Sequence, residues 1–212
     1  MQKIQCFTAA NLNTLCDKLA SIDKDLDGII RKYGYPFFWH REATFETVIH
    51  IILEQQVSLA SAKAALNKLQ EKLGSITPNK LLLLNDEEIK ACYFSRQKVV
   101  CARVVANAIV NKQLLLDELF LLDDNAVRLK LTKLKGIGNW TVDVFLMMVL
   151  HRCNLFPTGD VALMKSIKEV KQLPTNITKE DVLKIASNWQ PYQTIASYLL
   201  WWAYIKKRSI KL

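Results

Sequence analysis

The sequence is poor in glycine and proline and has no long apolar segment, and these shortages exclude whole classes of protein. With 6 Gly and 5 Pro in 212 residues, the chain lacks the many turn residues that a β-sandwich or β-barrel needs. Its unbroken apolar runs are short, as at Val144–Leu150, whereas a membrane-spanning helix needs about twenty such residues. We therefore expect an all-α protein with no transmembrane helix and no membrane partner.

Clustered cysteines are also missing. The 5 cysteines are scattered along the chain, and none forms a C-x-x-C pair or has a histidine at ligand spacing. We therefore expect no zinc and no iron-sulfur cluster, and we expect small buried thiols of a reducing compartment. The N-terminal segment Met1–Cys6 carries one charge and no apolar stretch of signal-peptide length. This favours an intracellular protein, in the cytoplasm or nucleoid, or in the nucleus of a eukaryote.

Positive charge and apolar residues are what the chain has in quantity. It contains 29 Lys and Arg against 20 Asp and Glu, a formal net charge of +9, and 50% of its residues are hydrophobic. This composition indicates a folded protein and not a disordered one. The basic excess fits a nucleic-acid partner or another acidic surface, although a solvated basic face alone is common.

Helical spacing of apolar residues recurs along the chain, with a capping residue before most segments. No β-hairpin signal, internal repeat or low-complexity segment interrupts it. The aromatic segment Tyr33–Trp39 reads as a loop, whose rings either anchor the core or border a ligand cleft. We expect helices after Thr44, from Ser58 to Gly74, from Asp86, after Ser95, from Asp123, from Gly138 to about His151, after Asp160, from Thr178, and from Pro191 through Trp201 to the basic residues 206–208.

The most informative segment is Leu131–Phe145, where one helix ends, a Gly136-Ile137-Gly138 turn follows, and another helix begins. The backbone N–H groups of such a turn and of the new helix point outward and form an anion site. Glycine lets the main chain approach a phosphate closely, and Lys133 and Lys135 add positive charge. An ordinary connection between two helices would give the same pattern, so the turn alone does not decide between these interpretations.

Asp160 follows Gly159 directly and precedes an expected helix. Asp in this place is most often only an N-cap. The same place fixes the orientation of a carboxylate and favours its charged form, as a charge-stabilising catalytic group requires. The helix carboxylates Glu54 and Asp143 are weaker candidates, because Asp143 is expected to face solvent or to pair with a basic neighbour. The three histidines form no triad and no metal set, and we assign them no role.

Three segments, taken in order, resemble the helix-hairpin-helix DNA glycosylase superfamily, specifically its 3-methyladenine DNA glycosylase II branch. They are Phe45–Ala62, Leu131–Phe145 with the later Gly159-Asp160, and Trp189–Trp202, and the resemblance covers roughly residues 24–204. It implies an all-α fold of two helical lobes, residues 1–43 with 153–212 and residues 44–152, with DNA bound across the cleft between them. The β-rich N-terminal domain of some members has no room in this chain.

The resemblance also implies roles for single residues. Asp160 matches the catalytic aspartate, and Trp140 stands where lyase-type relatives carry a Schiff-base lysine, so we expect base removal without strand cleavage. Gln56 lies near the position of the residue that fills the gap left by a flipped nucleotide. The main-chain carbonyls of Thr132, Leu134 and Ile137 match the ligands of a Na⁺ or K⁺ ion, and no other cofactor is expected. The expected DNA contacts are Gln55, Gln56, Ser58, Lys133, Lys135, Gly136, Gly138 and Asn139.

The chemistry agrees with these residues. A purine alkylated at N3 or N7 is cationic and leaves easily, so one carboxylate can stabilise the charge that develops on the sugar. Aromatic faces attract a cationic base, and the expected base contacts are Trp140, Trp189, Tyr35 and Phe37. We therefore expect a monomeric, monofunctional glycosylase of base excision repair that removes 3-methyladenine and 7-methylguanine from double-stranded DNA. A non-catalytic DNA-binding protein with the same hairpin, or a glycosylase for another lesion class, is the alternative.

Overall fold

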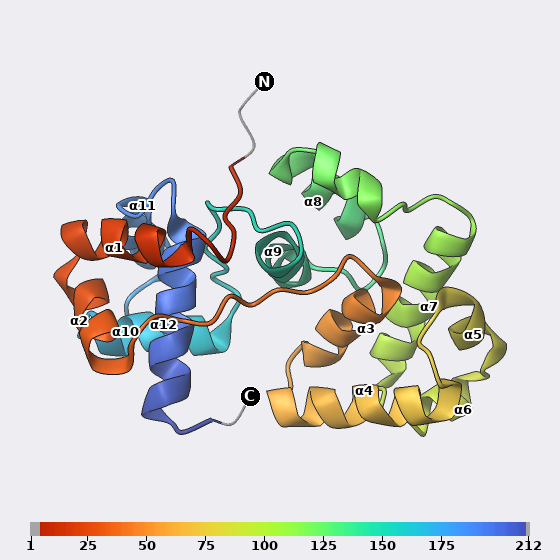
Figure 1. Ribbon diagram of the computed structural model, residues 1–212. Helices are drawn as coiled ribbons and strands as arrows, with labels where there is room; N and C mark the ends of the chain where they lie inside the picture. The colour runs from red at the N-terminus through yellow and green to blue at the C-terminus, as the bar shows by residue number, and fades with distance from the viewer. Residues whose placement is uncertain (1–4, 211–212) are drawn as a thin grey trace. The chain divides into compact units, whose positions relative to one another are not determined.

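The computed structural model describes residues 5–210, and the regular secondary structure of these residues is helical (Figure 1). They form twelve α-helices and one 3-10 helix. Within this described part there is no β-strand, only an isolated bridge between Cys6 and Arg152. The expected all-α fold is therefore confirmed. No helix in residues 5–210 has the length and apolar character to cross a membrane.

The chain divides into two compact units, and the boundary at Phe145/Leu146 falls within α9 (Asn139–Met148). The terminal unit joins the N-terminal segment as far as His40 to the C-terminal segment from Leu146, and the hairpin unit spans Arg41–Phe145. The helices of the terminal unit are α1 (Leu12–Ile22), α2 (Lys24–Tyr33), α10 (Val161–Val170), α11 (Lys179–Ser187) and α12 (Gln193–Lys207). Those of the hairpin unit are α3 (Phe45–Glu54), α4 (Leu59–Leu73), α5 (Pro78–Leu83), α6 (Asp86–Lys90), α7 (Arg96–Val110), η1 (Asp117–Leu121) and α8 (Asp124–Thr132).

The core of the terminal unit is built around α12, which packs against α1, α2 and α10. All residues of α12 from Gln193 to Ala203 are buried. Its buried hydroxyls are satisfied within the unit, because Thr194 donates to the Arg152 carbonyl at 2.6 Å and Ser197 donates to the Gln193 carbonyl at 2.9 Å. A helix that is apolar on nearly every face thus becomes the centre of its unit.

The hairpin unit follows the expected capping pattern. The side chains of Thr44, Ser58, Ser95 and Asp123 each accept a hydrogen bond from a backbone N–H in the first turn of the helix that they precede. In this unit α3 packs on α4 and α7, and α5 packs on α7. Because these caps are local interactions, the sequence alone was enough to find the starts of these four helices.

Some elements differ from the sequence expectation. The helix after Gly138 ends at Met148 and not near His151, and the last helix begins at Gln193 and not at Pro191. Helices α1, α2 and α5 and the 3-10 helix η1 were not anticipated. Helix α2 is capped by Asp23, whose side chain accepts from the N–H groups of Asp25 and Leu26, although Gly28 within it lowers helix propensity.

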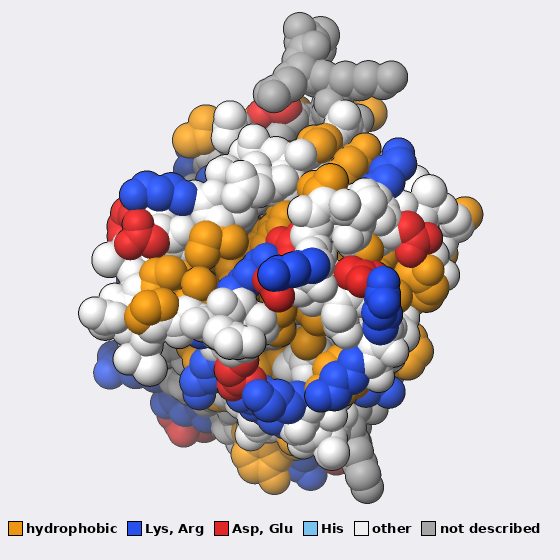
Figure 2. Space-filling model, turned by 90° about the vertical axis from the view of Figure 1, so that its left-hand side faces the viewer, with side chains coloured by type: hydrophobic (Ala, Val, Ile, Leu, Met, Phe, Trp, Pro, Cys, Tyr) orange, Lys and Arg blue, Asp and Glu red, His pale blue; other side chains and the backbone are white. Residues whose placement is uncertain are grey.

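The cysteines are unpaired, and Cys16, Cys92, Cys101 and Cys153 are buried while Cys6 is exposed. Burial raises the pKa of the Cys101 thiol to about 12, so this side chain behaves as a small apolar residue. On the face of the molecule drawn in Figure 2, basic, acidic and apolar side chains are intermixed.

Candidate functional site

The helix–turn–helix formed by α8, residues 133–138 and α9 lies in the hairpin unit. The turn is closed by two backbone hydrogen bonds, from the Leu134 N–H to the Leu131 carbonyl at 3.1 Å and from the Ile137 N–H to the Leu134 carbonyl at 3.0 Å. Gly136 has a φ of 95°, and a Cβ there would lie 2.6 Å from the Cβ of Cys101. The first glycine of the turn is therefore required by the fold itself.

The second glycine has a different environment. A Cβ on Gly138 would meet nothing within 4 Å, so packing inside the protein does not require glycine there. Gly138 and the following Asn139 are exposed, as are Lys133 and Lys135 on the other side of the turn. This surface presents backbone N–H groups at the start of a helix beside two ammonium groups, which suits an anion such as a phosphate.

Asp143 of α9 is held by a local ion pair. Its carboxylate lies 2.5 Å from the guanidinium of Arg128 in α8, and a second nitrogen of that guanidinium lies 3.1 Å from the side-chain oxygen of Asn139. Burial raises the pKa of Asp143, against the opposing effect of Arg128. Arg128 therefore ties the two helices of the hairpin together, and Asp143 serves this contact. Of the two environments expected for Asp143, pairing with a basic neighbour is the one observed.

The loop between α3 and α4 contains the other expected DNA contacts of this unit. The Ser58 hydroxyl caps α4 by accepting from the Ser61 N–H at 3.1 Å. The Gln55 amide nitrogen donates to the Gly136 carbonyl at 3.1 Å and to the Thr141 hydroxyl at 2.9 Å. Gln56, in contrast, is exposed. The side chains of Gln55 and Ser58 thus make hydrogen bonds inside the unit, while Gln56 and its neighbour Val57 are both exposed.

Trp140 lies in the first turn of α9, one residue after Asn139, and its side chain is partly exposed. Glu54, at the end of α3, is only 9% exposed and is paired with both terminal nitrogens of the Arg41 guanidinium, at 2.9 and 2.6 Å. The carboxylate of Glu54 therefore supports the fold and is not available as an acid or base.

Asp160 lies in the terminal unit as the N-cap of α10. Its Oδ1 atom accepts from the Leu163 N–H at 2.8 Å and from the indole Nε1 of Trp201 at 3.0 Å. The side chain is partly exposed. Backbone and indole donors thus fix the plane of a carboxylate that still reaches solvent, an arrangement suited to stabilising a positive charge at a fixed point.

One aromatic ring of the terminal unit, that of Trp201, contacts this carboxylate, and the ring of Trp39 packs against Trp201. Trp201 is 8% exposed, and its ring stands edge-on to that of Trp39, with centroids 6.3 Å apart. The Trp39 carbonyl accepts from the Tyr198 hydroxyl at 3.0 Å, which anchors the loop before His40 to α12. The sequence reasoning missed Trp201 as a neighbour of Asp160, because no local pattern links this tryptophan to an aspartate 41 residues earlier.

The expected base contact by Trp189 is corrected by the structure. This side chain is 1% exposed, and its indole N–H donates to Asp23 at 2.7 Å. Its ring also packs beside Phe156, with centroids 5.8 Å apart. A ring with almost no accessible surface cannot stack on a nucleobase, so Trp189 is a core residue.

The other two expected base contacts, Tyr35 and Phe37, are exposed in the loop after α2, by 40% and 58%. The Tyr35 hydroxyl donates to Asp17 at 2.8 Å, and the Phe37 ring stands edge-on to Trp202 with centroids 4.9 Å apart. Both rings belong to the same unit as Asp160 and retain free surface. Their contact with a base stays a prediction.

The expected cation ligands of the hairpin turn are main-chain oxygens, and their binding of a Na⁺ or K⁺ ion stays a prediction. The carbonyl of Leu134 accepts the Ile137 N–H and keeps a second lone pair, and the expected ligands at Thr132 and Ile137 are also main-chain carbonyls. Three neutral oxygens suit a hard monovalent cation. In residues 5–210 no group of three or more His, Cys, Asp and Glu side chains is placed to hold a metal ion.

Comparison with known proteins gives a consistent result. A family model described as "HhH-GPD superfamily base excision DNA repair protein" matches residues 49–191, a range that includes the hairpin and Asp160. The chain is 29% identical over 190 residues to the alkylbase DNA glycosidase-like protein mag2 of Schizosaccharomyces pombe, a match that covers 86% of this chain and 89% of that protein.

Solved structures show the same similarity. The S. pombe 3-methyladenine DNA glycosylase Mag1, solved in complex with abasic DNA, superposes with a TM-score of 0.81 at 26% identity, covering 89% of this chain and 95% of that chain. A DNA-3-methyladenine glycosidase from Bacillus halodurans superposes with a TM-score of 0.73 at 25% identity, covering 99% and 95%.

Proposed function

The chain belongs to the HhH-GPD superfamily of base excision DNA repair proteins, and on this basis we propose that it is a monofunctional DNA glycosylase for alkylated purines. The observation that carries the proposal is the Asp160 carboxylate, held at the N-terminus of α10 by the Leu163 N–H and the Trp201 indole. The names of its relatives, alkylbase and 3-methyladenine DNA glycosylases, supply the substrate class.

Asp160 acts on the sugar and not on the base. When the N-glycosidic bond of an N3- or N7-alkylated purine breaks, the base leaves with the bonding electron pair as a neutral molecule and positive charge develops on the sugar. The Asp160 carboxylate stabilises that charge and accepts the proton of the water that attacks the anomeric carbon. Because the leaving group is already cationic in the substrate, no separate acid is needed to protonate it.

The hairpin turn holds the DNA backbone. Lys133 and Lys135 and the N–H groups that begin α9 contact phosphates, which carry no sequence information. The enzyme therefore binds double-stranded DNA irrespective of sequence, and selects its target by how readily a damaged base leaves the stack. The carbonyls of Thr132, Leu134 and Ile137 would hold a Na⁺ or K⁺ ion, which would add positive charge at the hairpin turn. That the protein acts as a monomer, in the cytoplasm, nucleoid or nucleus, stays a prediction.

Trp140 explains why the strand is left intact. A glycosylase that also cleaves the strand needs an amine to form a Schiff base with the sugar, and in the first turn of α9 this chain carries an indole in the place that the resemblance gives to that lysine. The Trp140 ring offers instead a π face that attracts a cationic base. Base release without strand cleavage is the expected reaction.

Base release from defined DNA tests the proposal. DNA treated with a methylating agent and synthetic duplexes with a single 8-oxoguanine are incubated with the protein, and free bases are separated by chromatography. We expect release of 3-methyladenine and 7-methylguanine, little or no release of 8-oxoguanine, and strand breaks only after added alkali. Release of 8-oxoguanine without action on methylated purines would overturn the substrate class, and strand breaks without alkali would overturn the monofunctional assignment.

A further inference from the structure

The loop that joins α3 to α4 holds one residue in a strained backbone conformation. Gln56 has a φ of 58°, in the left-handed region that residues other than glycine rarely occupy. Such a conformation costs roughly 1–3 kcal/mol and persists only where the surrounding structure enforces it. The side chain of Gln56 is nevertheless exposed. Contacts made by the residues on either side of Gln56 must therefore enforce the conformation.

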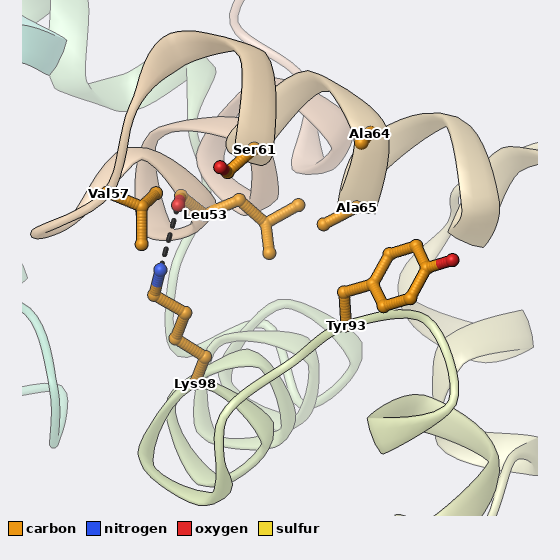
Figure 3. A pocket seen from close by; sticks show the side chains of 7 residues that line it. All are labelled: Leu53, Val57, Ser61, Ala64, Ala65, Tyr93 and Lys98. Carbon is orange, nitrogen blue, oxygen red and sulfur yellow. Dashed lines mark hydrogen bonds between the residues drawn. The ribbon is translucent and has the colours of Figure 1, made fainter.

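Lys98 supplies one of these contacts from outside the loop. It lies in the first turn of α7 and its ammonium donates to the Leu53 carbonyl in the last turn of α3, at 2.8 Å (Figure 3). Burial lowers the pKa of Lys98, so the desolvated ammonium is kept here by its hydrogen bond and by the negative end of the α3 dipole. The same side chain lines a cavity of about 320 Å³ together with Val57 of the loop and Ser61 of α4.

Gln55, directly before Gln56, supplies a second contact. Its amide nitrogen donates to the carbonyl of Gly136 in the hairpin turn and to the hydroxyl of Thr141 in α9. Thr141 is only 5% exposed, so this contact is partly shielded from water. Lys98 thus fixes the chain before Gln56, Gln55 ties the loop to the hairpin, and Ser58 begins α4 directly after it.

We propose that Lys98 and Gln55 are positioning residues that hold Gln56 ready to enter the space that an extruded nucleotide leaves in the DNA stack. This inference rests on the proposed function, because an enzyme that hydrolyses a base in a duplex must first remove that base from the stack. A side chain that fills the space keeps the base from returning. A preformed loop does this without paying for the ordering of the loop on the DNA.

Two DNA substrates separate positioning from general support of the fold. One carries 7-methylguanine paired in a duplex, and the other carries it as a single-nucleotide bulge, where stacking is already weakened and a filling residue contributes little. We expect Lys98→Met and Gln55→Met to slow single-turnover base release from the paired lesion about tenfold, and from the bulge no more than about twofold, because the cost of extrusion is smallest for an unpaired base.

Lys80→Met is the matched control. The Lys80 ammonium donates to the Leu73 carbonyl at the end of α4, at 3.0 Å, so the variant loses the same kind of contact and the same charge away from the loop. It should release base from both DNAs at the wild-type rate. Lys98→Arg, which keeps a cationic donor, should recover most of the activity on the paired lesion.

The contradicting results are distinct. Equal loss on both DNAs, or no loss on either, would show that Lys98 and Gln55 do not act through the loop. If Lys98→Met does not fold, Gln55→Met alone tests the proposal, by the ratio of its rates on the paired and the bulged lesion. Absence of base release by the wild-type protein from either DNA would instead overturn the proposed function, and this inference with it.

Discussion

The Asp160 carboxylate receives hydrogen bonds from two parts of the terminal unit. Its position as N-cap is local, because the Leu163 N–H is three residues away. The Trp201 indole comes from the middle of α12, a helix that is buried on nearly all sides. One side chain, that of Trp201, therefore connects the buried core of the unit to the carboxylate. Substitutions of single residues can test what the carboxylate and its surroundings do.

Asp160→Asn tests the charge at this point. The amide keeps the shape and can still accept the hydrogen bonds to Oδ1, but it cannot stabilise a positive charge on the sugar. We expect single-turnover base release to fall by about 10²–10³-fold or more, with DNA affinity unchanged or slightly higher because one negative charge near the phosphates is lost. The measurement is single-turnover kinetics on a 7-methylguanine duplex, with fluorescence anisotropy for binding. A near wild-type rate would refute the role of Asp160.

Trp140→Ala tests the aromatic contact to the base. A cation over an indole face contributes about 0.5–2 kcal/mol, which corresponds to roughly 2- to 30-fold in rate or affinity. We expect the loss to be larger for the cationic base 7-methylguanine than for a neutral base such as hypoxanthine, measured as the ratio of single-turnover rates. Trp140→Phe should keep part of the difference. Equal losses on both bases would assign Trp140 to packing alone.

At the scale of an element, the hairpin uses its two glycines differently. Gly136 has a positive φ and lies against the buried Cys101, while Gly138 has open space around it. The fold therefore explains why residue 136, an expected DNA contact, is glycine. The fold does not explain why residue 138 is glycine. Open space at Gly138 is the feature that a backbone approaching from outside would use.

Alanine substitutions separate the two glycines. Gly136→Ala places a methyl group in contact with Cys101 and forces alanine into the left-handed region, so we expect a loss of about 2–4 kcal/mol in the free energy of unfolding. Gly138→Ala should change that free energy by less than about 1 kcal/mol and weaken DNA binding instead. Urea denaturation and anisotropy on the same two variants check this. Equal destabilisation of both would contradict the distinction.

At the scale of the whole molecule, the terminal unit joins chain ends that are far apart in sequence. Lys171, just after α10, lies 2.6 Å from Asp23 and 2.9 Å from Asp25, and the Trp189 indole also donates to Asp23. Burial alone would raise the pKa of Asp23, but the hydrogen bonds from Lys171 and Trp189 outweigh it and hold the pKa below its ordinary value. One partly buried cluster thus fastens the N-terminal helices to the C-terminal segment.

The pH dependence of stability follows from these directions. Because the folded pKa of Asp23 is depressed, its contribution is present above the ordinary value of 3.8 and is lost as pH falls through the folded value below it. Hydrogen bonds to Asp23 and Asp25 outweigh burial and raise the pKa of Lys171, so its contribution is present below 10.5 and is lost as pH rises through the folded value above it. Between these limits the cluster stabilises the unit fully.

Lys171→Met tests this cluster. We expect a loss on the order of 2 kcal/mol at pH 7, because Asp23 keeps its charge without its main partner. The acid-induced fall in stability should also be smaller than in the wild type, because without Lys171 the folded pKa of Asp23 lies closer to its ordinary value. Urea denaturation from pH 3 to pH 8 measures both. The control is Lys184→Met, whose exposed pair with Asp181 should contribute less than about 1 kcal/mol. Equal losses in the two variants would contradict the role of the cluster.

Sequence analysis correctly found the features that depend on residues close together in the chain. Thr44, Ser58 and Ser95 lie at the positions where their side chains accept the first-turn N–H groups, and the apolar spacing behind them defined the buried faces. Asp160 belongs to the same class, because its cap is formed three residues away. Helix α1, which no side chain caps, was not anticipated, and neither were α2 and α5, although Asp23 and Thr77 cap them.

The sequence by itself determined the all-α fold, most of the helix starts, the hairpin and Asp160, because periodicity and capping act over one or two turns of chain. Tertiary structure alone decided what Trp189, Trp201 and Gln55 do. Their hydrogen bonds join residues that are 166, 41 and 81 positions apart in the chain. The sequence around a tryptophan in an apolar segment looks the same whether the ring lies in the core or beside a carboxylate. Which of these occurs depends on how the helices of a unit pack together, and helical periodicity carries no information about partners so distant in the chain.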